Sequence, residues 1–540
     1  MSSSALATTS APLPFERASV STSARAKIQA VLAIGFGVAL TLTMQGYQFG
    51  KSNHTVYLID ALRRTSPNLL QNDWFVTQTL QYHAAFGLLT RALMKLGVIE
   101  PAFLIGYLLL AILLHTAWWR ITKALGGGGG VSAFLLSEVL FHLSGAGTGL
   151  GIYQFLQDSA FLPSNIASVA MLWAICFWIT GRRGWSAVLF GVSGLFHLNY
   201  AIVAPFMWVV LTLIAWLKDR RRPTALDCFG AIAMTELCLM NIIPAMLAIS
   251  QRSGKMPLDN FIELYVRLRH PHHYAPLTWS IGLWLSFLWP LPLAWMYWWR
   301  RHDENDAVEQ ARRIVDAIVL LLVIAFFGAG VWFISETLVQ LSLWRFSVFV
   351  KLITCTGAAL WILSKLRRRE RLITAMSTVV GLALIAACIV RGPYLGFVRL
   401  PGDDPNYLAA CAWIRDHTPT DAIFVVPPEE QAFRLNAQRA IVVNYKCVPQ
   451  LSGELPAWRD RLGAILSMDI RNLRTPFEET LYDIRDRYDN LPASHLANVA
   501  RHYDARYIVV RHRLPSEWEP ARVAAMDDAT TMYFLYDLQR

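Results

Sequence analysis

Long apolar runs separated by short basic connectors constrain the fold of this chain more than any other feature. A helix needs about 20 consecutive, mostly apolar residues to cross a bilayer. By that criterion the sequence predicts about eleven membrane-spanning helices, at residues 28–46, 101–119, 131–147, 162–180, 185–199, 200–217, 226–249, 277–298, 313–334, 347–364 and 372–391. The composition agrees, since 55% of the residues are hydrophobic and only 16% are charged, whereas soluble domains carry about 25% charged residues.

Lysine and arginine gather in the connectors, for example at 182–183, 218–222 and 365–371. Cytoplasmic loops of membrane proteins carry this excess of positive charge. We therefore predict a cytoplasmic N-terminus, with residues 1–27 as a disordered cytoplasmic tail, and a C-terminal part, 392–540, outside the cytoplasm. The net charge of +11 then reflects membrane topology, and we expect no nucleic-acid partner.

Residues after about 400 have the composition of a soluble domain. Short apolar segments predict strands at 422–426, 440–443, 507–510 and 532–536, and helical periodicity predicts helices at 404–417, 456–467 and 494–503. Strands that alternate with helices indicate a small α/β domain, of three layers, at 392–540. The predicted fold is therefore a polytopic α-helical domain, 28–391, followed by this α/β domain.

The loop at 47–100 follows the first apolar run and contains two notable carboxylates. Asp73 lies among apolar and aromatic residues, where desolvation raises the pKa of a carboxyl group and suits it to act as a base; alternatively it caps a helix that begins at Trp74. Asp60 has the spacing of an (i, i+4) ion pair with Arg64. The end of the loop, 82–96, predicts an amphipathic helix at the membrane interface.

This architecture resembles the GT-C class of integral-membrane glycosyltransferases, in which a long acidic first outer loop and a C-terminal outer domain accompany a helical bundle. The segment WIRDHTPTDA at 413–422 is similar to the W-x-x-x-x-T-P-x-D-A opening of this domain in many bacterial proteins of this kind. The positions Phe433, Arg434, Arg439 and Lys446, together with RHPHHY at 269–274, resemble an uncharacterised bacterial family placed near these enzymes.

The resemblance implies a bacterial inner-membrane enzyme that moves a sugar from a polyprenyl-phosphate-linked donor to an extracytoplasmic acceptor, which is an unidentified glycan, lipid or protein. In this class an acidic residue of the first outer loop acts as the base or as a metal ligand. Asp73 or Asp60 would carry that catalytic role here.

Some members of the class use a divalent metal ion that acids of the first two outer loops share. Asp158, in the second outer loop, would be the metal ligand here, together with Asp73 or Asp60. Carboxylate oxygens suit Mg²⁺ or Mn²⁺. Adjacent histidines at 270–273 do not have the usual spacing of a zinc site.

A donor phosphate needs cationic partners at the outer face of the membrane. Arg345 lies at the outer end of its predicted helix, and its planar guanidinium suits phosphate; the alternative is that it extends to the interface as a surface side chain. The other candidate substrate-binding residues are His54, His197, Arg267, Arg269, His270, His272 and His273.

Two other function classes fit a polytopic membrane protein. One is a transporter or another non-enzymatic protein that handles lipids or glycans, and the second is a GT-C scaffold that has lost activity. The sequence has no internal repeat and no pair of helices broken by glycine or proline, features that are typical of transporters.

Overall fold

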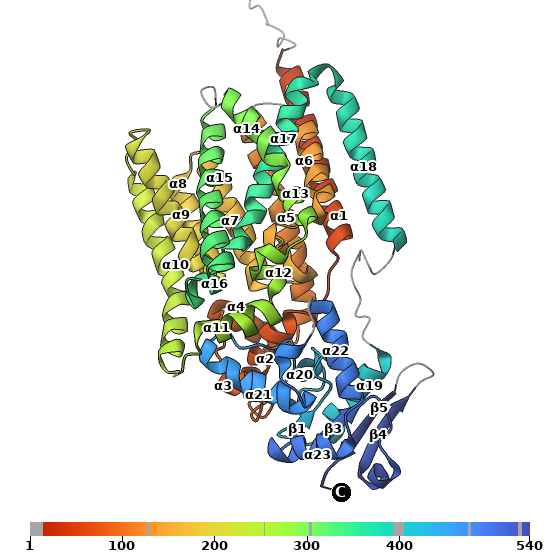
Figure 1. The fold of residues 1–540 in the computed structure, drawn as a ribbon. Helices are drawn as coiled ribbons and strands as arrows, with labels where there is room; N and C mark the ends of the chain where they lie inside the picture. Colours follow the sequence, from red (N-terminus) through yellow and green to blue (C-terminus); the bar gives the residue numbers. More distant parts are fainter. Residues whose placement is uncertain are drawn as a thin grey trace, which may run out of the picture.

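The computed structural model describes residues 15–126, 130–252, 254–301, 305–391, 404–473, 477–527 and 532–539. Within them, helices form an elongated bundle, and a small domain that contains a sheet lies at one end of it (Figure 1). The predicted tail falls partly outside the described residues, at 1–14. Helix α1 (Phe15–Gln45) includes residues 15–27, so the first helix begins earlier than predicted.

Seven helical stretches of the described chain are long and apolar enough to cross a membrane: Ala24–Gln45, Ile99–Gly126, Leu198–Leu217, Ala225–Ser250, Asp306–Val331, Glu336–Lys365 and Arg367–Val390. Gly130–Leu143 and Gly145–Ile152, bent by 91°, would together make an eighth. The predicted count of about eleven is therefore not confirmed. The runs at 185–199 and 277–298 do form helices, but α8 has 14 residues and α14 has 12, fewer than a straight span needs.

The helices of the bundle are separated in part by short connections and in part by longer segments, at 46–98, 251–280 and 325–346. After α1 they are α5 (Ile99–Gly126), α6 (Gly130–Leu143), α7 (Pro163–Ile179), α8 (Arg183–Phe196), α9 (Leu198–Leu217), α10 (Ala225–Ser250), α13 (Ile281–Leu288), α14 (Pro290–Arg301), α15 (Asp306–Ile324), α17 (Ser347–Lys365) and α18 (Glu370–Arg391). The break between α8 and α9 is the single residue His197, which explains why the sequence has almost no polar hairpin there.

Short helices cover the end of the bundle that faces the small domain (Figure 1). They are α2 (His54–Thr65), α3 (Trp74–Gln78), α4 (Ala84–Lys95), α11 (Leu258–Phe261), α12 (Pro271–Tyr274), α16 (Glu336–Gln340), the 3₁₀-helix η7 (Leu343–Phe346) and two π-helices, η4 (Ile262–Arg269) and η6 (Ala325–Val331). Helix α4 confirms the short helix predicted at 82–96.

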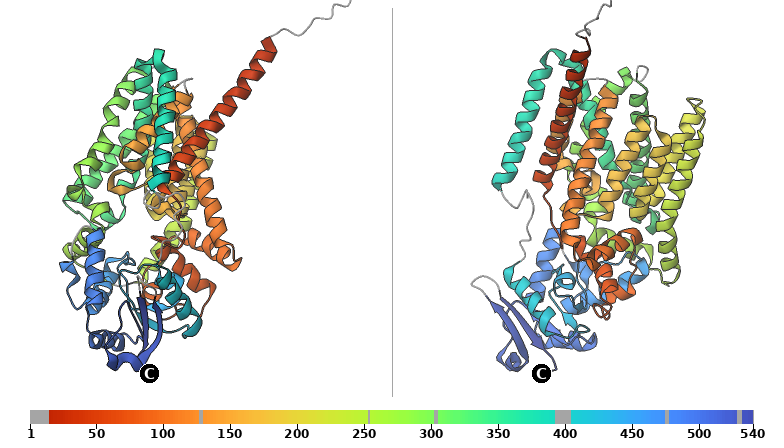
Figure 2. Two further views of the ribbon diagram at one scale, coloured as in Figure 1. Left: turned by 90° about the vertical axis from the view of Figure 1, so that its right-hand side faces the viewer. Right: turned by 180° about the vertical axis from the view of Figure 1, so that it is seen from behind.

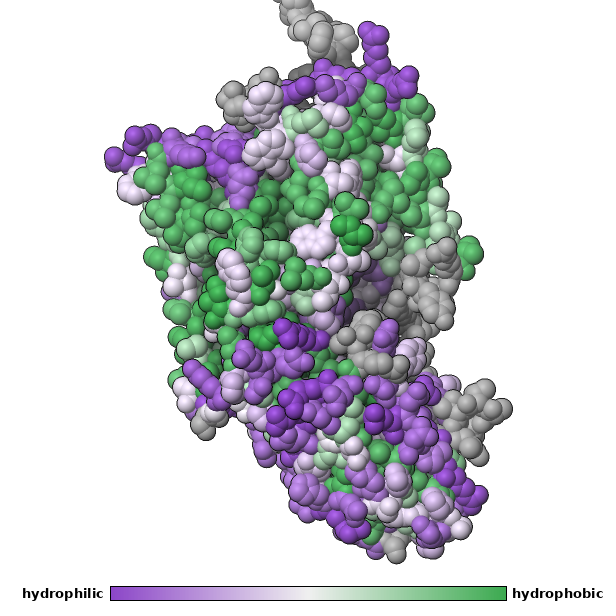
Figure 3. Space-filling model, viewed as in Figure 1, coloured by the Kyte–Doolittle hydropathy of each residue, from purple (hydrophilic) through white to green (hydrophobic). Residues whose placement is uncertain are grey.

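The surface of the bundle is apolar where a bilayer would surround it. Figure 3 shows hydrophobic residues over the helices, with hydrophilic residues at the far end and over the small domain. Large apolar side chains are exposed on α10 and α18, among them Phe229, Ile232, Val379 and Leu382. Exposed apolar area of this extent is unfavourable in water, so the bundle is a membrane domain.

The C-terminal domain contains a five-stranded sheet in the order β2-β1-β3-β5-β4. The strands are β1 (Ile423–Val425), β2 (Ala440–Ile441), β3 (Tyr507–Val510), β4 (Arg522–Asp527) and β5 (Met532–Asp537). β1 pairs in parallel with β2 and β3, whereas β5 is antiparallel to β3 and β4. Four strands match the predicted ones, and β4 was missed because its sequence, RVAAMD, has a single β-branched residue and two alanines, a residue type that is depleted in strands.

Helices cover both faces of this sheet, which confirms the three-layer prediction. Along β3, Tyr507 and Val509 pack with α19 (Pro405–His417), while Ile508 and Val510 pack against the opposite layer. That layer contains α21 (Leu455–Leu466), α22 (Phe477–Asp489) and α23 (Ala493–His502). Period-two alternation of side chains places successive strand residues on opposite faces, and both faces are apolar because both are covered.

The core of the opposite layer continues into the membrane domain. Trp74 and Phe75 of the first outer loop belong to the same buried cluster as Trp458 and Leu462 of α21, and so do residues of η4 such as Tyr265. The first outer loop, coloured dark orange, lies beside the blue C-terminal domain in the view from behind (Figure 2). The C-terminal domain therefore shares a core with the outer loops and has no separate one on this face.

Glycine permits the closest helix contact of the bundle. A Cβ atom at Gly230 of α10 would lie 2.3 Å from the carbonyl oxygen of Gly184 in α8. Because that neighbour is backbone, the two helices would have to move apart to accommodate a methyl group. Small residues allow such close backbone approach in membrane bundles.

We predict that Gly230→Ala destabilises the protein by about 1–3 kcal/mol, the usual cost of overpacking. The measurement is the midpoint of thermal unfolding in detergent micelles. The matched control is Gly35→Ala in α1, where a Cβ atom would have no neighbour within 4 Å. Equal midpoints for the two variants would contradict the close contact of α8 with α10.

Candidate functional site

A cavity of about 1310 Å³ lies where one end of the bundle meets the C-terminal domain. Its walls come from the loop at 47–100, the segment 145–164, the start of α9, the segment 263–286, the segment 330–345 and the C-terminal domain. The predicted site residues that line it are Asp158, His197, Arg267, Arg269, His270, His272, His273 and Arg345. The other three, His54, Asp60 and Asp73, are not among the described residues of its lining.

The π-helix η4 carries two of the predicted arginines, and they have different roles. Arg267 is 65% exposed and pairs with Glu263 at 3.3 Å. Arg269 is buried and donates to the carbonyl oxygens of Tyr445 and Lys446, both at 3.2 Å. Its guanidinium also lies 5.1 Å from the centroid of the Tyr445 ring. Arg269 therefore fastens the wall of the cavity to the C-terminal domain, whereas Arg267 lies at the rim.

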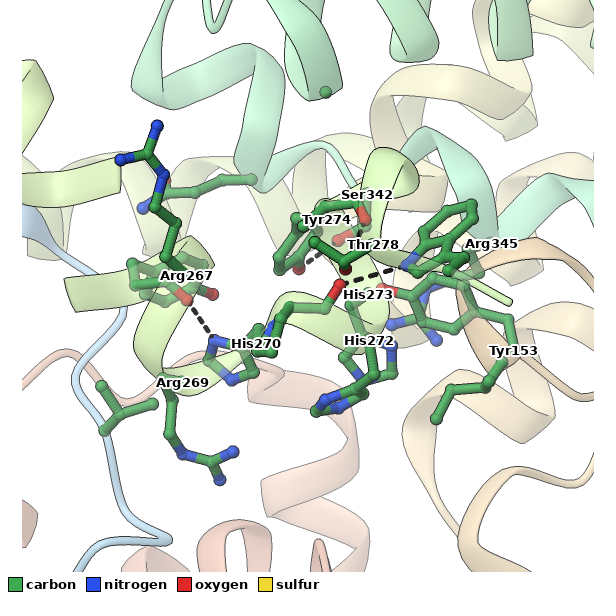
Figure 4. A pocket seen from close by; sticks show the side chains of 18 of the residues that line it. Tyr153, Arg267, Arg269, His270, His272, His273, Tyr274, Thr278, Ser342 and Arg345 are labelled. Atoms are coloured by element: carbon green, nitrogen blue, oxygen red, sulfur yellow. Dashed lines mark hydrogen bonds between the residues drawn. The ribbon is translucent and has the colours of Figure 1, made fainter. Parts of the chain in front are cut away.

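The three histidines that follow η4 line the cavity as neutral rings (Figure 4). His270 donates from Nδ1 to the carbonyl of Tyr265 at 2.9 Å, and His273 donates from Nδ1 to that of Gly151 at 2.8 Å. Burial, followed by the charge of Arg269, lowers the pKa of His270 well below its usual value and that of His272 to about 4. Each neutral ring keeps one nitrogen that accepts a hydrogen bond.

Arg345 lies in η7, directly before α17, and its guanidinium is 4.5 Å from the centroid of the Tyr153 ring. Its Nε is buried and has no hydrogen-bond partner among the described residues. Tyr274, next to it in Figure 4, shares a hydrogen bond of 2.6 Å with Ser342. A guanidinium carries five donors, so a partly buried one without a carboxylate partner among the described residues is suited to bind an anion.

Lys446 brings a second cation to the cavity from the C-terminal domain. Burial lowers the pKa of its ammonium group, and the negative charge of Asp158 opposes that effect. No ion pair or hydrogen bond of the ammonium group is found within the described part of the chain. Lys446 and Asp158 therefore line the same cavity and are close enough to interact electrostatically.

Asp158 is one of two carboxylates of the cavity, and the other, Glu263, is paired with Arg267. Its Oδ2 accepts from the hydroxyl of Ser52 at 2.9 Å. Its Oδ1 accepts from the amide of Gln157 at 3.3 Å. The backbone has a φ of +60°, which aspartate adopts more readily than most residues.

Asp73 has a structural environment that differs from the one expected of a base. One oxygen, Oδ1, accepts from the backbone of Val76 at 3.1 Å and caps α3, as the alternative interpretation predicted. The other, Oδ2, accepts from Nε of Arg434 at 2.7 Å and from the backbone of Ile441 at 3.1 Å. The carboxylate is fully buried between the first outer loop and the C-terminal domain, and no substrate reaches it in this arrangement.

His54 holds the loop at 47–100 against a distant segment, whereas Asp60 makes a local ion pair within α2. Asp60 accepts from Nε of Arg64 at 2.7 Å, the (i, i+4) pair that its spacing predicted. His54 accepts the N–H of Gly50 at Nδ1 and donates from Nε2 to the carbonyl of Phe161. Neither side chain is free to bind a sugar or a phosphate.

The donors of the described chain do not fit the expected Mg²⁺ or Mn²⁺ ion. A hard divalent cation needs several carboxylate oxygens around one point. Asp158 is held by Ser52, Asp60 by Arg64 and Asp73 by Arg434, so the three candidate ligands face different partners. The described residues contain no group of three or more histidine, cysteine or acidic side chains arranged to hold a metal ion.

Several residues of the cavity were not assigned from the sequence. They are Tyr57, Tyr82, Tyr153, Tyr265 and Tyr274, and Lys446. Tyrosines in apolar segments give no signal of their own in one sequence. Lys446 and Arg434 were already part of the motif that carries the family resemblance, and that motif was the available signal.

Comparisons with known proteins bear on the fold. Residues 405–465 match the model of a domain of unknown function (DUF6798). No curated protein sequence matches the chain. The structure is similar to the archaeal oligosaccharyltransferase AglB from Archaeoglobus fulgidus, solved with an inhibitory peptide and a dolichol-phosphate. That likeness has a TM-score of 0.51 at 11% identity and covers 90% of this chain and 69% of that one.

Two structures of ArnT from Cupriavidus metallidurans show a lower likeness. The form bound to undecaprenyl phosphate has a TM-score of 0.41 at 16% identity, and covers 95% of this chain and 98% of that one. The apo form has a TM-score of 0.42 at 14% identity, with 96% and 98% covered. The likeness to AglB extends over the bundle and the C-terminal domain, and it gives the chain a GT-C-like fold.

Acidification should loosen the first outer loop through His54. Burial lowers the pKa of this ring to about 4 from 6.5 in the unfolded chain, and protonation at Nδ1 would break the bond from Gly50. The unfolded chain therefore binds more protons between pH 6.5 and 4. Stability is complete above pH 6.5 and falls as the pH falls through this window.

The test compares the thermal unfolding midpoint in micelles at pH 7.5 and pH 5. We expect a decrease that is smaller in His54→Gln, which cannot be protonated. His502→Gln is the control, because His502 is exposed. A decrease of the same size in all three proteins would mean that His54 does not contribute.

Proposed function

We propose that this protein is a membrane glycosyltransferase that moves a sugar from a polyprenyl-phosphate-linked donor to an extracytoplasmic acceptor. The observation that carries the proposal is the cavity at the junction of bundle and C-terminal domain, which combines two cations without an ion pair among the described residues, Arg345 and Lys446, with a carboxylate that no cation pairs there, Asp158. In this proposal the protein lies in a bacterial inner membrane, with a cytoplasmic N-terminus and the cavity on the outer side.

The donor phosphate would bind at Arg345. A buried guanidinium is stabilised by an anion that accepts two parallel hydrogen bonds, and phosphate has that geometry. His197 and His273 line the same space. As neutral rings they would add hydrogen bonds to the phosphate, while Arg345 supplies the positive charge. Tyr153 supports the guanidinium from its ring face.

The polyprenyl chain would leave the cavity on its apolar side. Leu277, Gly282 and Leu283 line the cavity next to α13. Leu277 and the adjacent Ile281 are 71% and 73% exposed on the surface of the bundle. An apolar wall that continues from the cavity to the lipid-facing surface suits a substrate whose head is anionic and whose tail belongs in the bilayer.

Asp158 would act as the base. A hydroxyl of the acceptor would attack the anomeric carbon of the donor sugar and lose its proton to the Asp158 carboxylate. The bond from the anomeric carbon to the phosphate oxygen breaks, and its electron pair stays on the polyprenyl phosphate. Arg345 and Lys446 would stabilise the negative charge that develops on this leaving group.

The fold supports the same proposal. AglB, whose fold this chain shares, was solved with a dolichol-phosphate, which is a polyprenyl-type lipid phosphate. The acceptor, whether glycan, lipid or protein, would enter from the side of the C-terminal domain, which supplies Lys446, Gln450 and Arg471 to the cavity.

Binding of undecaprenyl phosphate to the purified protein in micelles tests the donor site. Loss of one charge-assisted contact to an anion costs about 1.5–3 kcal/mol. We therefore expect Arg345→Ala to raise the dissociation constant by about 10- to 100-fold. Arg345→Lys should recover part of this loss. Arg64→Ala, an exposed arginine paired with Asp60, is the control. An unchanged affinity in Arg345→Ala would reject Arg345 as the phosphate ligand.

Asp158→Asn tests the base. Asparagine keeps the shape, tolerates a positive φ and still accepts from Ser52, so the variant removes the charge and, besides it, only the 3.3 Å hydrogen bond from the amide of Gln157. We expect transfer to fall by about 100-fold or more, in line with the loss of a general base, while binding of undecaprenyl phosphate persists. The readout in cells is the surface glycan or glycolipid of a deletion strain that is complemented with each variant, at matched protein levels. Full complementation by Asp158→Asn would overturn the assignment.

A further inference from the structure

We propose that the buried ion pair between Asp73 and Arg434 is a positioning device that holds Lys446 in the cavity, so that donor binding depends on docking of the C-terminal domain onto the first outer loop. This inference rests on the proposed function, because it gives Lys446 a role in binding the anionic donor. It assigns Asp73 a role other than that of a base.

The first step is that several buried hydrogen bonds join the two domains at Asp73. Both side chains of the pair are almost completely buried, with exposed fractions of 0% and 1%. The carboxylate accepts from Arg434 and, in addition, from the backbone N–H of Ile441 in β2. One carboxylate of the first outer loop thus holds both a side chain and a strand of the C-terminal domain.

The second step leads from Arg434 to the segment that carries Lys446. Arg434 donates from Nη1 to Oδ1 of Asn444 at 3.2 Å. The same oxygen accepts from the backbone N–H of Cys447 at 3.0 Å. Asn444 also accepts at its carbonyl from the indole of Trp458 at 3.1 Å. The backbone on both sides of Lys446 is therefore fixed by a chain of contacts that begins at Asp73.

The third step is the placement of this segment against the membrane domain. Tyr445 donates from its hydroxyl to the carbonyl of Leu268 at 3.0 Å, and Arg269 donates to the carbonyls of Tyr445 and Lys446. On the other side, the thiol of Cys447 lies 3.7 Å from the carbonyl of Thr55 in α2. The segment 444–447 is held between η4 and the first outer loop, and between these attachments the side chain of Lys446 lines the cavity.

A simple structural role would not require this arrangement. The contacts that begin at Asp73 reach the backbone of Cys447 through Arg434 and Asn444, while the ammonium group of Lys446 keeps no ion pair within the described chain. These contacts thus fix the backbone of Lys446, and its ammonium group stays available to bind an anionic ligand. That is the property expected of a positioned binding residue.

The first experiment measures the segment directly and needs no ligand. Cys447 is buried and free, so its thiol should react slowly with a maleimide in the wild-type protein in micelles. In Asp73→Asn we expect the rate of Cys447 alkylation, followed by peptide mass spectrometry, to rise by about tenfold or more, because local opening exposes the thiol. Asp60→Asn, which removes an exposed ion pair, is the control. An unchanged rate in Asp73→Asn overturns the proposal.

The second experiment is a double-mutant cycle on the binding of undecaprenyl phosphate. We expect Lys446→Ala and Asp73→Asn each to weaken binding by about tenfold, since each removes the contribution of the same ammonium group. The variant that carries both changes should bind no more weakly than Lys446→Ala alone, because coupled residues do not give additive effects. Weakening by the product of the two factors would overturn the proposal, since independent effects indicate a general structural role.

A variant that leaves the ion pair intact is the control for misfolding. Asn444→Ala removes the link between Arg434 and Cys447 but leaves Asp73 and Arg434 paired, and it should give the same non-additivity with Lys446→Ala. If Asp73→Asn does not fold, this variant decides the question with the same two outcomes. If the wild-type protein does not bind undecaprenyl phosphate, the proposed function fails, whereas the alkylation of Cys447 still decides whether the ion pair holds the segment.

Discussion

The arrangement of this protein depends on one buried ion pair. Asp73 and Arg434 are 361 positions apart in the chain, and their contact fixes the C-terminal domain against the first outer loop. Removing one partner of a buried pair leaves an uncompensated charge and typically costs about 3–5 kcal/mol. The cavity has a wall from each domain, so it exists in this shape only while the two are docked.

The bilayer explains why so many irregular elements meet at this place. Backbone groups inside the hydrocarbon region must be paired within helices, and other backbone is tolerated only where protein or a cavity surrounds it. The π-helices η4 and η6, the short helices α12 and α16 and the bend after α6 all lie at the outer end of the bundle. There they form the walls of the cavity, and the C-terminal domain covers them.

The cavity combines a carboxylate, cations and several neutral histidines. Asp158 and the cations Arg345 and Lys446 surround one space, while the histidines between them are kept neutral by burial. Two arginines of the segment 250–276 have partners in the C-terminal domain at the same place. Arg252 pairs with Glu454 at 3.0 Å, and Arg269 holds the backbone at 445–446. These arginines bind the C-terminal domain and do not report membrane topology.

The sequence alone determined the apolar helices, the basic connectors, most strands of the sheet and the basic segment at 267–273, because these depend on periodicity and composition within short stretches. The sequence also predicted a catalytic role and a structural role for Asp73 and Asp60, but it did not decide between the two. That choice rests on partners remote in the chain: Arg434 neutralises Asp73, and Ser52 holds Asp158 at the cavity. Local pattern cannot encode such contacts, since only tertiary packing decides which of several similar carboxylates is buried in an ion pair and which one is left to face a substrate.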